Sequence, residues 1–411
     1  MSAICIFEDR SYSQLHPLSL TRPVFELRCG LTSLREKIRR QFPDRALHFM
    51  CRDYLVETVQ ETQSVANVND LTSGECLFIN GHLLADSRLP KALSTESERL
   101  YLHQGQLVAA FLNGSNIEKM QRSYKGLDLS KFDDVPKVEI EAQIIEYPWD
   151  LVNLNAQEIQ KDFAYLKQGG QIQGKVYDQA TLLNKDEIYV GKNSVIKPGA
   201  VLDAEAGPIY VGENVTIMPN AVIEGPVFIG DNSIIKIGAK IYEGTSIGEW
   251  CKVGGEVEES IVHSHTNKQH DGFLGHAYLG QWVNLGADTN NSDLKNNYHP
   301  VKVPINGQMV DSGSMFVGLF MGDHSKAGIN TMFNTGTVVG PMSNVFGGGF
   351  PPKFIPSFAW GGKDGFVEHN LEKALETARR VMARRNIDMS PAYETLFRHV
   401  FELTQNERTW A

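Results

Sequence analysis

Between Val190 and Val345 a large apolar residue returns at nearly every sixth position, and glycine often follows it. A half-buried strand alternates with a period of two and a helix with a period of about 3.6, so neither explains a repeat of six. A parallel β-helix built from hexapeptide repeats explains it. Twenty of the 22 positions in phase are large and apolar. The expected inward positions are Val190, Ile196, Leu202, Val211, Ile217, Ile223, Ile229, Ile235, Ile241, Ile247, Val253, Ile261, Asn267, Phe273, Leu279, Leu285, Met315, Met321, Ala327, Phe333, Val339 and Val345.

This pattern resembles the left-handed parallel β-helix of the hexapeptide acyltransferases, in which three hexads form one triangular coil. The resemblance implies about seven coils, each of which stacks its inward side chains on those of its neighbours. A rigid spacer or a trimerisation stalk is the alternative interpretation. The chemistry must therefore come from the residues that interrupt the repeat.

The remaining sequence predicts an α/β domain before the β-helix and helices after it. Residues 3–7 and 75–80 have the pattern of strands, and residues 31–42 and 156–167 that of amphipathic helices. In the tail, an apolar helix face lies mostly opposite four arginines, Arg379, Arg380, Arg384 and Arg385. These arginines either form a solvated face or contact the phosphate of a bound nucleotide. The expected divisions are an α/β domain over 1–167, a linker over 168–184, the β-helix over 185–348 and a C-terminal extension with helices over 349–411.

Composition narrows the class of protein. The length of 411 residues allows two or three domains. A net charge of -10 argues against nucleic-acid binding, which needs a basic surface. The five scattered cysteines indicate neither a disulfide framework nor a zinc knuckle, and no apolar run approaches the ~18 residues of a membrane span. We therefore expect a cytoplasmic protein.

Polar residues gather where the hexapeptide repeat is interrupted. Asn267, Lys268 and His270 are followed by Asn284 and by a long polar segment over 286–298. An imidazole can deprotonate an incoming amine, amides can hold a sugar, and a lysine can hold a phosphate. These residues predict an acyl-transfer site, and the alternative is that they cap surface turns.

A zinc site is a further interpretation of the same region. His265 and His270 have the His-x4-His spacing of the γ-carbonic anhydrases, which need a third histidine about two coils earlier. The first histidine upstream of His263 is His103, which lies outside the β-helix. We therefore do not expect zinc.

Residues 254–257, 267–276 and 282–287 resemble the acetyltransferase half of the bifunctional N-acetylglucosamine-1-phosphate uridylyltransferase/glucosamine-1-phosphate acetyltransferase family, above all its short variant from Bacteroidetes and related bacteria. The resemblance implies that His270, five residues before Gly275, is the general base. Phe273 stands where well-studied members have a tyrosine. The resemblance also implies sugar and phosphate contacts by Lys268, Asn284, Asn297, Tyr298 and Lys302, and acyl-CoA contacts by Lys326 and Asn334.

The N-terminal segment has the pattern of a phosphate site, because a turn with Arg22 follows the first strand and precedes a helix that carries Lys37. It resembles the sugar nucleotidyltransferase domain of the same short variant. This implies that Arg22 and Lys37 bind the nucleotide, and that Asp150 and Asn153 hold Mg²⁺. Asn80 stands where standard enzymes have an aspartate. An active uridylyltransferase and a degenerate domain that binds or oligomerises both remain open.

These features predict a transferase of UDP-N-acetylglucosamine biosynthesis. The β-helix would N-acetylate an amino-sugar 1-phosphate, most simply glucosamine-1-phosphate, with acetyl-CoA as co-substrate. The N-terminal domain would transfer a nucleotidyl group from UTP to the sugar 1-phosphate. The partners implied are these small molecules and two further copies in a homotrimer, with neither nucleic acid nor membrane. The alternatives are a nucleotidyltransferase whose β-helix only oligomerises and a non-catalytic scaffold.

Overall fold

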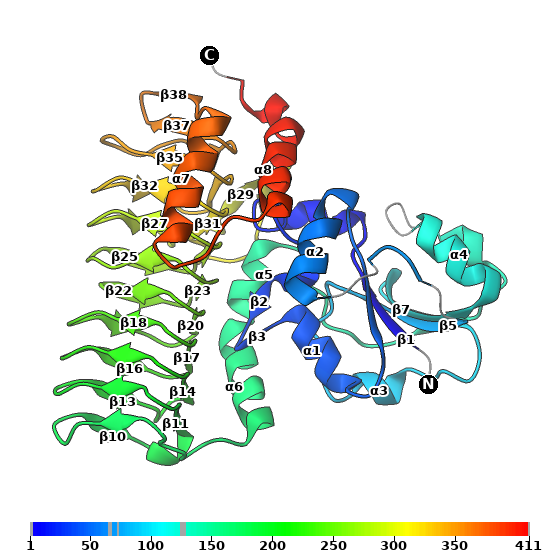
Figure 1. Ribbon diagram of the computed structural model, residues 1–411, viewed down its shortest axis with the longest axis horizontal. Helices are drawn as coiled ribbons and strands as arrows, with labels where there is room; N and C mark the ends of the chain where they lie inside the picture. Colours follow the sequence, from blue (N-terminus) through cyan, green and yellow to red (C-terminus); the bar gives the residue numbers. More distant parts are fainter. Residues whose placement is uncertain (1–2, 65–67, 72–73, 124–128, 410–411) are drawn as a thin grey trace.

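The computed structural model describes residues 3–64, 68–71, 74–123 and 129–409. Figure 1 shows three parts: an α/β domain, a long β-helix beside it, and two C-terminal helices that return across the junction of the two. This arrangement confirms the fold class expected from the sequence.

The N-terminal domain contains a mixed six-stranded sheet in the order β4-β1-β5-β7-β6-β8. β1 pairs in parallel with β4 and β5, and β7 pairs antiparallel with β5 and β6. Its strands are β1 (Ala3–Phe7), β4 (Leu47–Met50), β5 (Glu75–Asn80), β6 (Arg99–His103), β7 (Gln106–Asn113) and β8 (Lys137–Glu139), beside a hairpin of β2 (Arg28–Cys29) and β3 (Thr32–Ser33). The helices are α1 (Leu34–Gln41), α2 (Val56–Gln63), α3 (Leu89–Ala92), α4 (Gly114–Ser123), α5 (Pro148–Asn153) and α6 (Asn155–Leu166).

The β-helix has three parallel sheets, which we call I, II and III. Sheet I contains β10 (Thr181–Leu183), β13 (Val201–Asp203), β16 (Val222–Glu224), β19 (Lys240–Ile241), β22 (Glu256–Glu258) and β25 (Phe273–Gly275). Sheet II contains β11 (Ile188–Val190), β14 (Ile209–Val211), β17 (Val227–Ile229), β20 (Thr245–Ile247), β23 (Ile261–Val262), β26 (Tyr278–Leu279), β31 (Leu319–Met321), β34 (Thr337–Val339) and β36 (Phe354–Ile355). Sheet III contains β9 (Lys175–Val176), β12 (Val195–Ile196), β15 (Thr216–Ile217), β18 (Ile234–Ile235), β21 (Lys252–Val253), β24 (Asn267–Lys268), β27 (Asn284–Leu285), β32 (Lys326–Ala327), β35 (Asn344–Val345) and β37 (Ala359–Gly362), with β38 (Gly365–Glu368) antiparallel at its edge.

The β-helix has about 10 turns, more than the seven expected from the hexads. β9 and β10 lie within residues 168–184, treated above as a linker, and both pair with strands of the next turn. β36 and β37 lie beyond residue 348 and extend sheets II and III. Leu182 lies eight residues before Val190, and Ile355 lies ten residues after Val345, so a count in steps of six missed these end turns.

The inward phase in the middle of the β-helix differs from the expected one by one residue. Val262, Lys268 and Leu274 are fully or almost fully buried, whereas the expected Asn267 and Phe273 are only half-buried. Val262 follows Val257 after five residues instead of six. This slip of one residue moves each following side chain to the other face of its strand.

Lys268 therefore occupies an inward position in an otherwise aliphatic column. It pairs in register with Val253 and is 2% exposed. Its Nζ donates hydrogen bonds to the carbonyl oxygens of Gly254 and His270, at 2.9 Å each. Burial lowers the pKa of Lys268 to about 8. The lysine thus ties the corner of one coil to that of the coil before it.

An insertion interrupts the β-helix between β27 and β31. It contains β28 (Asn290–Asn291), which pairs with β33 (Met332–Phe333), and a hairpin of β29 (Lys302–Ile305) and β30 (Gln308–Asp311). Met315, an expected inward position, is 47% exposed in this insertion. The regular coil resumes only at β31.

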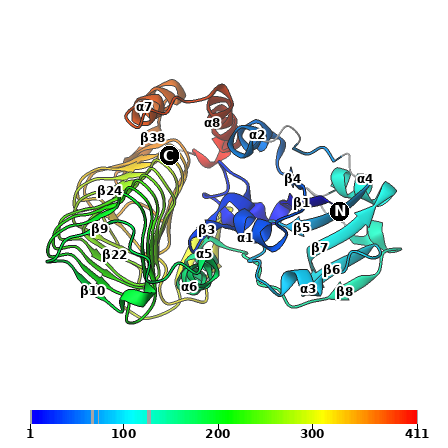
Figure 2. The same ribbon diagram turned by 60° about the horizontal axis from the view of Figure 1, so that its bottom comes forward.

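The outer face of sheet II is covered by the N-terminal domain (Figure 2). The Tyr278 hydroxyl accepts a hydrogen bond from the backbone N–H of Arg28 at 2.9 Å, and the Ser246 hydroxyl donates to the carbonyl of Gly30 at 2.9 Å. Arg22 forms a buried ion pair with Asp323, which also accepts a hydrogen bond from the Thr21 hydroxyl at 2.7 Å. Apolar packing and a buried charge pair therefore join the two domains.

The C-terminal helices are α7 (Leu371–Ala383) and α8 (Pro391–Leu403). Leu375 and Phe397 share a hydrophobic cluster with Phe25 and Val59 of the N-terminal domain. The tail thus bridges both domains (Figure 1). None of the helices in the described part of the chain has the length and apolar character to cross a membrane.

The buried Arg22–Asp323 pair leads to a first prediction. Arg22→Met should lower the free energy of unfolding by about 3 kcal/mol, because it leaves the Asp323 carboxylate buried without its cation. Arg22→Met combined with Asp323→Leu should restore most of the loss. Arg88→Met, which removes an exposed ion pair with Asp86, is the control and should have no measurable effect. Urea unfolding measures all three, and an Arg22→Met variant as stable as the wild type would refute the prediction.

Lys268 leads to a second prediction. Its pKa is about 8 in the folded protein, against a usual 10.5, so the unfolded chain binds more protons between these values and the free energy of unfolding rises with pH there. Lys268→Met removes this rise. From about pH 7.5 to about pH 10, the wild type should therefore gain up to about 3 kcal/mol relative to the variant in urea unfolding.

The control for Lys268 is Lys240→Met in sheet I. Lys240 is 56% exposed and pairs with Glu256 at 3.3 Å, so its removal should leave the pH dependence unchanged. The free energies of unfolding of Lys268→Met and the wild type should differ by an amount that changes with pH. A difference that stays constant across the pH window contradicts the lowered pKa of Lys268.

Candidate functional site

His270 lies at the corner between sheets III and I, directly after β24. Its side chain is exposed, and its carbonyl is held by Lys268 Nζ from inside the coil. Lys268 was expected to bind substrate, but its amine faces two backbone carbonyls within the prism. It therefore positions the corner that carries His270.

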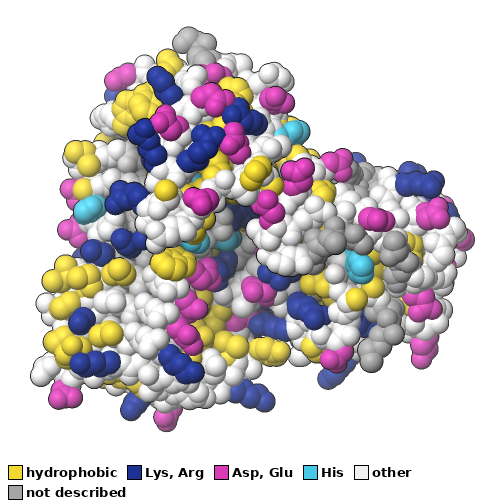
Figure 3. Space-filling view, viewed as in Figure 1, with side chains coloured by type: hydrophobic (Ala, Val, Ile, Leu, Met, Phe, Trp, Pro, Cys, Tyr) yellow, Lys and Arg dark blue, Asp and Glu magenta, His cyan; other side chains and the backbone are white. Residues whose placement is uncertain are grey.

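A cavity of about 190 Å³ lies beside this corner, between the outer face of sheet III and the C-terminal end of α7. We call it the basic pocket. Two expected site residues, Asn284 and Lys326, line it. Gln269, which immediately precedes His270, also lines it. Lys252, His265, Asn267, Trp282, Val381, Arg384 and Arg385 complete its lining. Figure 3 shows basic side chains where α7 meets the β-helix.

The floor of the basic pocket is rigid and aromatic. The His265 ring stacks on Trp282 with centroids 4.3 Å apart, and Trp282 stacks on His324 at 5.9 Å. Burial lowers the pKa of His265 to about 4, so this imidazole is neutral near pH 7. The described residues contain no group of three or more His, Cys, Asp or Glu side chains that could hold a metal.

The other expected site residues of the β-helix lie toward a different corner. Lys302 begins the β29–β30 hairpin, and Asn297 and Tyr298 precede it, all three exposed. Asn334 is also exposed, and the nearby Gly336 N–H donates to Val317. This group lies by the corner between sheets I and II, and β25 separates that corner from His270.

The corner between sheets I and II also holds a histidine that the sequence analysis did not single out as a base. His276 Nδ1 lies 2.9 Å from Asp293 Oδ2, and the ring stacks on Phe316 with centroids 5.1 Å apart. A carboxylate on one ring nitrogen orients the imidazole and leaves Nε2 for a proton. The partners are 17 residues apart across the insertion, so spacing gave no signal of the pair.

In the N-terminal domain, Lys37 is not free to bind a nucleotide. Its side chain is fully buried, and Nζ lies 2.8 Å from Glu158 and 2.7 Å from Asp162, both on α6. This corrects the expected nucleotide contact. The helix pattern located Lys37 on α1 but could not show that α6 covers that face.

Asp150 and Asn153, the expected magnesium ligands, both make structural contacts. Asp150 caps α5, where its Oδ2 accepts hydrogen bonds from the backbone N–H groups of Glu146 and Tyr147 at 2.9 and 2.8 Å. The Asn153 amide donates to the Ser314 hydroxyl at 3.2 Å. One carboxylate oxygen of Asp150 and the amide nitrogen of Asn153 are thus used in structural contacts, and no catalytic step is assigned to a metal at this position.

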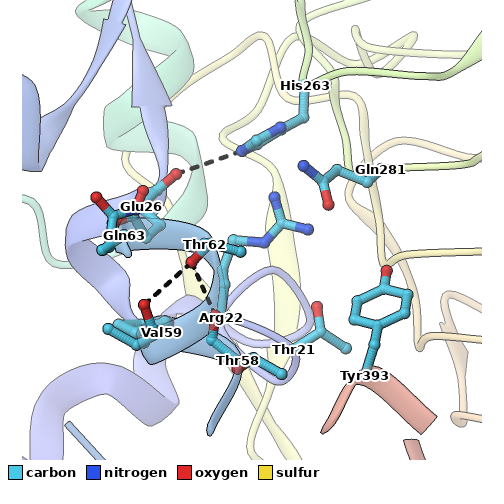
Figure 4. Close-up of a pocket in the computed structure, with 11 residues that line it drawn as sticks. Thr21, Arg22, Glu26, Thr58, Val59, Thr62, Gln63, His263, Gln281 and Tyr393 are labelled. Carbon is cyan, nitrogen blue, oxygen red and sulfur yellow. Dashed lines mark hydrogen bonds between the residues drawn. The ribbon is translucent and has the colours of Figure 1, made fainter. Parts of the chain in front are cut away.

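Arg22 lines a second cavity, of about 200 Å³, between the two domains and α8. Figure 4 shows its guanidinium between His263 and Gln281 of the β-helix, with Tyr393 of α8 nearby. Burial lowers the pKa of His263 well below its usual range, and Arg22 and Arg28 lower it further. Arg22, a predicted nucleotide contact, thus faces a cavity, but its guanidinium already forms an ion pair with Asp323.

A further polar cluster lies at the carboxyl ends of β1 and β5. The Asn80 amide donates to Asp9 Oδ2 at 3.1 Å, and His82 Nε2 lies 3.2 Å from the Ser11 hydroxyl. His82 Nδ1 lies 2.7 Å from the carbonyl of Ile145. Ligands of open α/β sheets bind outside the carboxyl ends of parallel strands. Asp9 is the second residue after the first predicted strand, a position that could have indicated this cluster.

Comparison with known proteins finds similarity to proteins named as transferases. The chain is 29% identical over 119 residues to the bifunctional sugar-1-phosphate nucleotidylyltransferase/acetyltransferase of Sulfurisphaera tokodaii, which covers 29% of each protein. It is 24% identical over 245 residues to the bifunctional protein GlmU of Ruthia magnifica, covering 57% of this chain and 51% of that protein. The chain thus aligns with between about a quarter and about half of these relatives' lengths.

Among solved structures, the UDP-N-acetylglucosamine acyltransferase from Campylobacter jejuni aligns with 56% of this chain and 96% of its own, at 13% identity and a TM-score of 0.32. The N-terminal domain matches the family model of the sugar nucleotidyl transferases over residues 4–171. Residues 4–171 are therefore similar to the sugar nucleotidyl transferases, and in this chain the matching domain is followed by a β-helix.

Proposed function

We propose that the protein is a transferase with two activities in sugar-nucleotide biosynthesis. The β-helix would N-acetylate an amino-sugar 1-phosphate, most simply glucosamine-1-phosphate, with acetyl-CoA. The N-terminal domain would then join the product to a nucleotide from UTP. The names of the relatives and the family match of residues 4–171 support this pairing of activities.

The main support for the proposed acyl transfer is the polar break in the core of the β-helix, the place where Lys268 interrupts the aliphatic column. Lys268 is a charged member of an aliphatic column, and it fixes the carbonyl of the exposed His270. A structural stalk has no need for this break, since an aliphatic residue would fill the column without the desolvation of an amine. Gln269, next to His270, opens onto the basic pocket.

In this proposal His270 acts as the general base. Its imidazole takes a proton from the sugar amine as the nitrogen attacks the thioester carbonyl of acetyl-CoA. The new N–C bond forms, the C–S bond breaks, and coenzyme A leaves as a thiolate that takes up a proton. Asn284 would orient the sugar beside the base, and Lys326 would contact the coenzyme.

The remaining proposed contacts favour a homotrimer. Asn297, Tyr298, Lys302 and Asn334 lie by the corner between sheets I and II, whereas His270 lies at the other end of β25. One chain does not bring the two groups together. A neighbouring copy that presents its own corner to His270 would complete the site.

The acyl transfer is tested by the substitution of His270. His270→Ala should lower the rate of coenzyme A release from acetyl-CoA and glucosamine-1-phosphate by about 10²–10⁴-fold, because the amine loses its proton acceptor. Release of pyrophosphate from UTP and N-acetylglucosamine-1-phosphate, the reaction of the other domain, should be unchanged.

His48→Ala, in β4 of the N-terminal domain, is the matched control and should keep both rates. His276→Ala separates the two candidate bases, because the His276–Asp293 pair lies at the other corner. If His276→Ala abolishes acyl transfer while His270→Ala retains it, His270 is not the base. Wild-type rates in His270→Ala also refute the proposal.

A further inference from the structure

The basic pocket carries four cationic side chains from two parts of the chain. Lys252 and Lys326 come from β21 and β32 of sheet III, with β24 and β27 between them, and Arg384 and Arg385 follow the end of α7. Its lining includes no aspartate or glutamate. The whole protein carries a net charge of -10, so this concentration of positive charge does not follow from the composition.

These four cations differ from the other charges of the tail in their partners. Among the described residues, none of the four has a carboxylate within 4.0 Å. Arg385 Nη2 donates instead to Asn267 Oδ1 at 3.0 Å, and Lys326 Nζ donates to the carbonyl of His324 at 3.2 Å. The other tail arginines are all paired: Arg379 with Glu394, Arg380 with Glu376 and Arg398 with Glu372 at 2.5–2.6 Å, and Arg408 with Glu368 at 3.1 Å.

The uncompensated charge has an electrostatic cost in the free protein. Burial lowers the pKa of Lys326 to about 8. Burial also lowers the pKa of Lys252, and the positive charges of Arg385, Lys236 and Arg384 lower it further. Like charges in a partly desolvated cavity repel one another, and an anion placed among them relieves the repulsion.

We propose that the basic pocket binds a phosphate group, with Arg384 and Arg385 of the tail and Lys252 and Lys326 of sheet III as its ligands. The pocket holds about 190 Å³, less than the roughly 300–1,000 Å³ of sites that enclose a whole small molecule. It therefore takes the phosphorylated end of a longer ligand. The remainder of the ligand extends along Asn284 and Gln269 toward His270.

This site makes the C-terminal tail part of the acyl-transfer centre. Arg385 already bonds to Asn267, which lies on the strand that leads to His270. Assignment of the phosphate to a reactant rests on the proposed acyl transfer, whereas phosphate binding itself does not. The phosphate belongs either to the nucleotide end of coenzyme A or to the sugar 1-phosphate.

Isothermal titration of the full-length protein tests the site with two probes, adenosine 3′,5′-bisphosphate and glucosamine-1-phosphate. At least one should bind the wild type, and Arg384→Gln/Arg385→Gln should weaken that binding by about 10- to 100-fold, the value of hydrogen bonds to charged groups. Arg379→Gln/Arg380→Gln removes two arginines from the same helix that face away from the pocket. It should bind like the wild type.

Weakened binding of the bisphosphate identifies the coenzyme end as the occupant, and weakened binding of glucosamine-1-phosphate identifies the sugar. If neither probe binds the wild type, or if the pocket variant binds both as the wild type does, the site is refuted. Thermal unfolding of the variants verifies that they are folded. If the pocket variant loses phosphate binding but the wild type releases no coenzyme A, the phosphate site stands and the proposed acyl transfer fails.

Discussion

The stacking of inward side chains along the β-helix is the constraint on which the rest of the structure depends. Each coil must place its aliphatic residues over those of the coil before it, and this fixes where every outward side chain lies. Sheet II thereby presents an apolar face that the N-terminal domain covers, with Tyr278 and Ser246 bonded to its backbone. Sheet III presents polar residues, and the tail helix closes over them. Lys268 places an amine within this stack, where it donates a hydrogen bond to the carbonyl of His270 and so holds the corner that carries this histidine.

Much of the fold could be predicted because its periods are simple. The hexapeptide repeat indicated the β-helix, and β1 and β5 begin and end where strands were expected. The inward positions predicted from the repeat were wrong where the length of a coil changes. A five-residue step between Val257 and Val262 shifted the phase, so Lys268 and not Asn267 faces inward. No periodic count detects one shortened corner, because apolar residues occupy both phases at Ile261 and Val262.

The candidate site was harder to predict because its parts come from distant segments. His270, Asn284 and Lys326 could be named from local motifs, but the arginines opposite them follow the tail helix α7, and Arg385 contacts Asn267 across 118 residues of sequence. Lys37 and Asp150 have the residue types of a nucleotide and metal site, yet a buried contact with α6 and a helix cap use them. Sequence identifies residue types, whereas tertiary packing decides which of them face a ligand.

We propose that the polar break in the β-helix, at Lys268 and His270, is an acyl-transfer site. Its most direct test incubates the full-length wild type with acetyl-CoA and glucosamine-1-phosphate and follows coenzyme A release together with the mass of the sugar phosphate. The account predicts release that requires both substrates, with one acetyl group added to the sugar for each coenzyme A. Release no faster than in the absence of protein, from a sample that still turns over UTP, would contradict it.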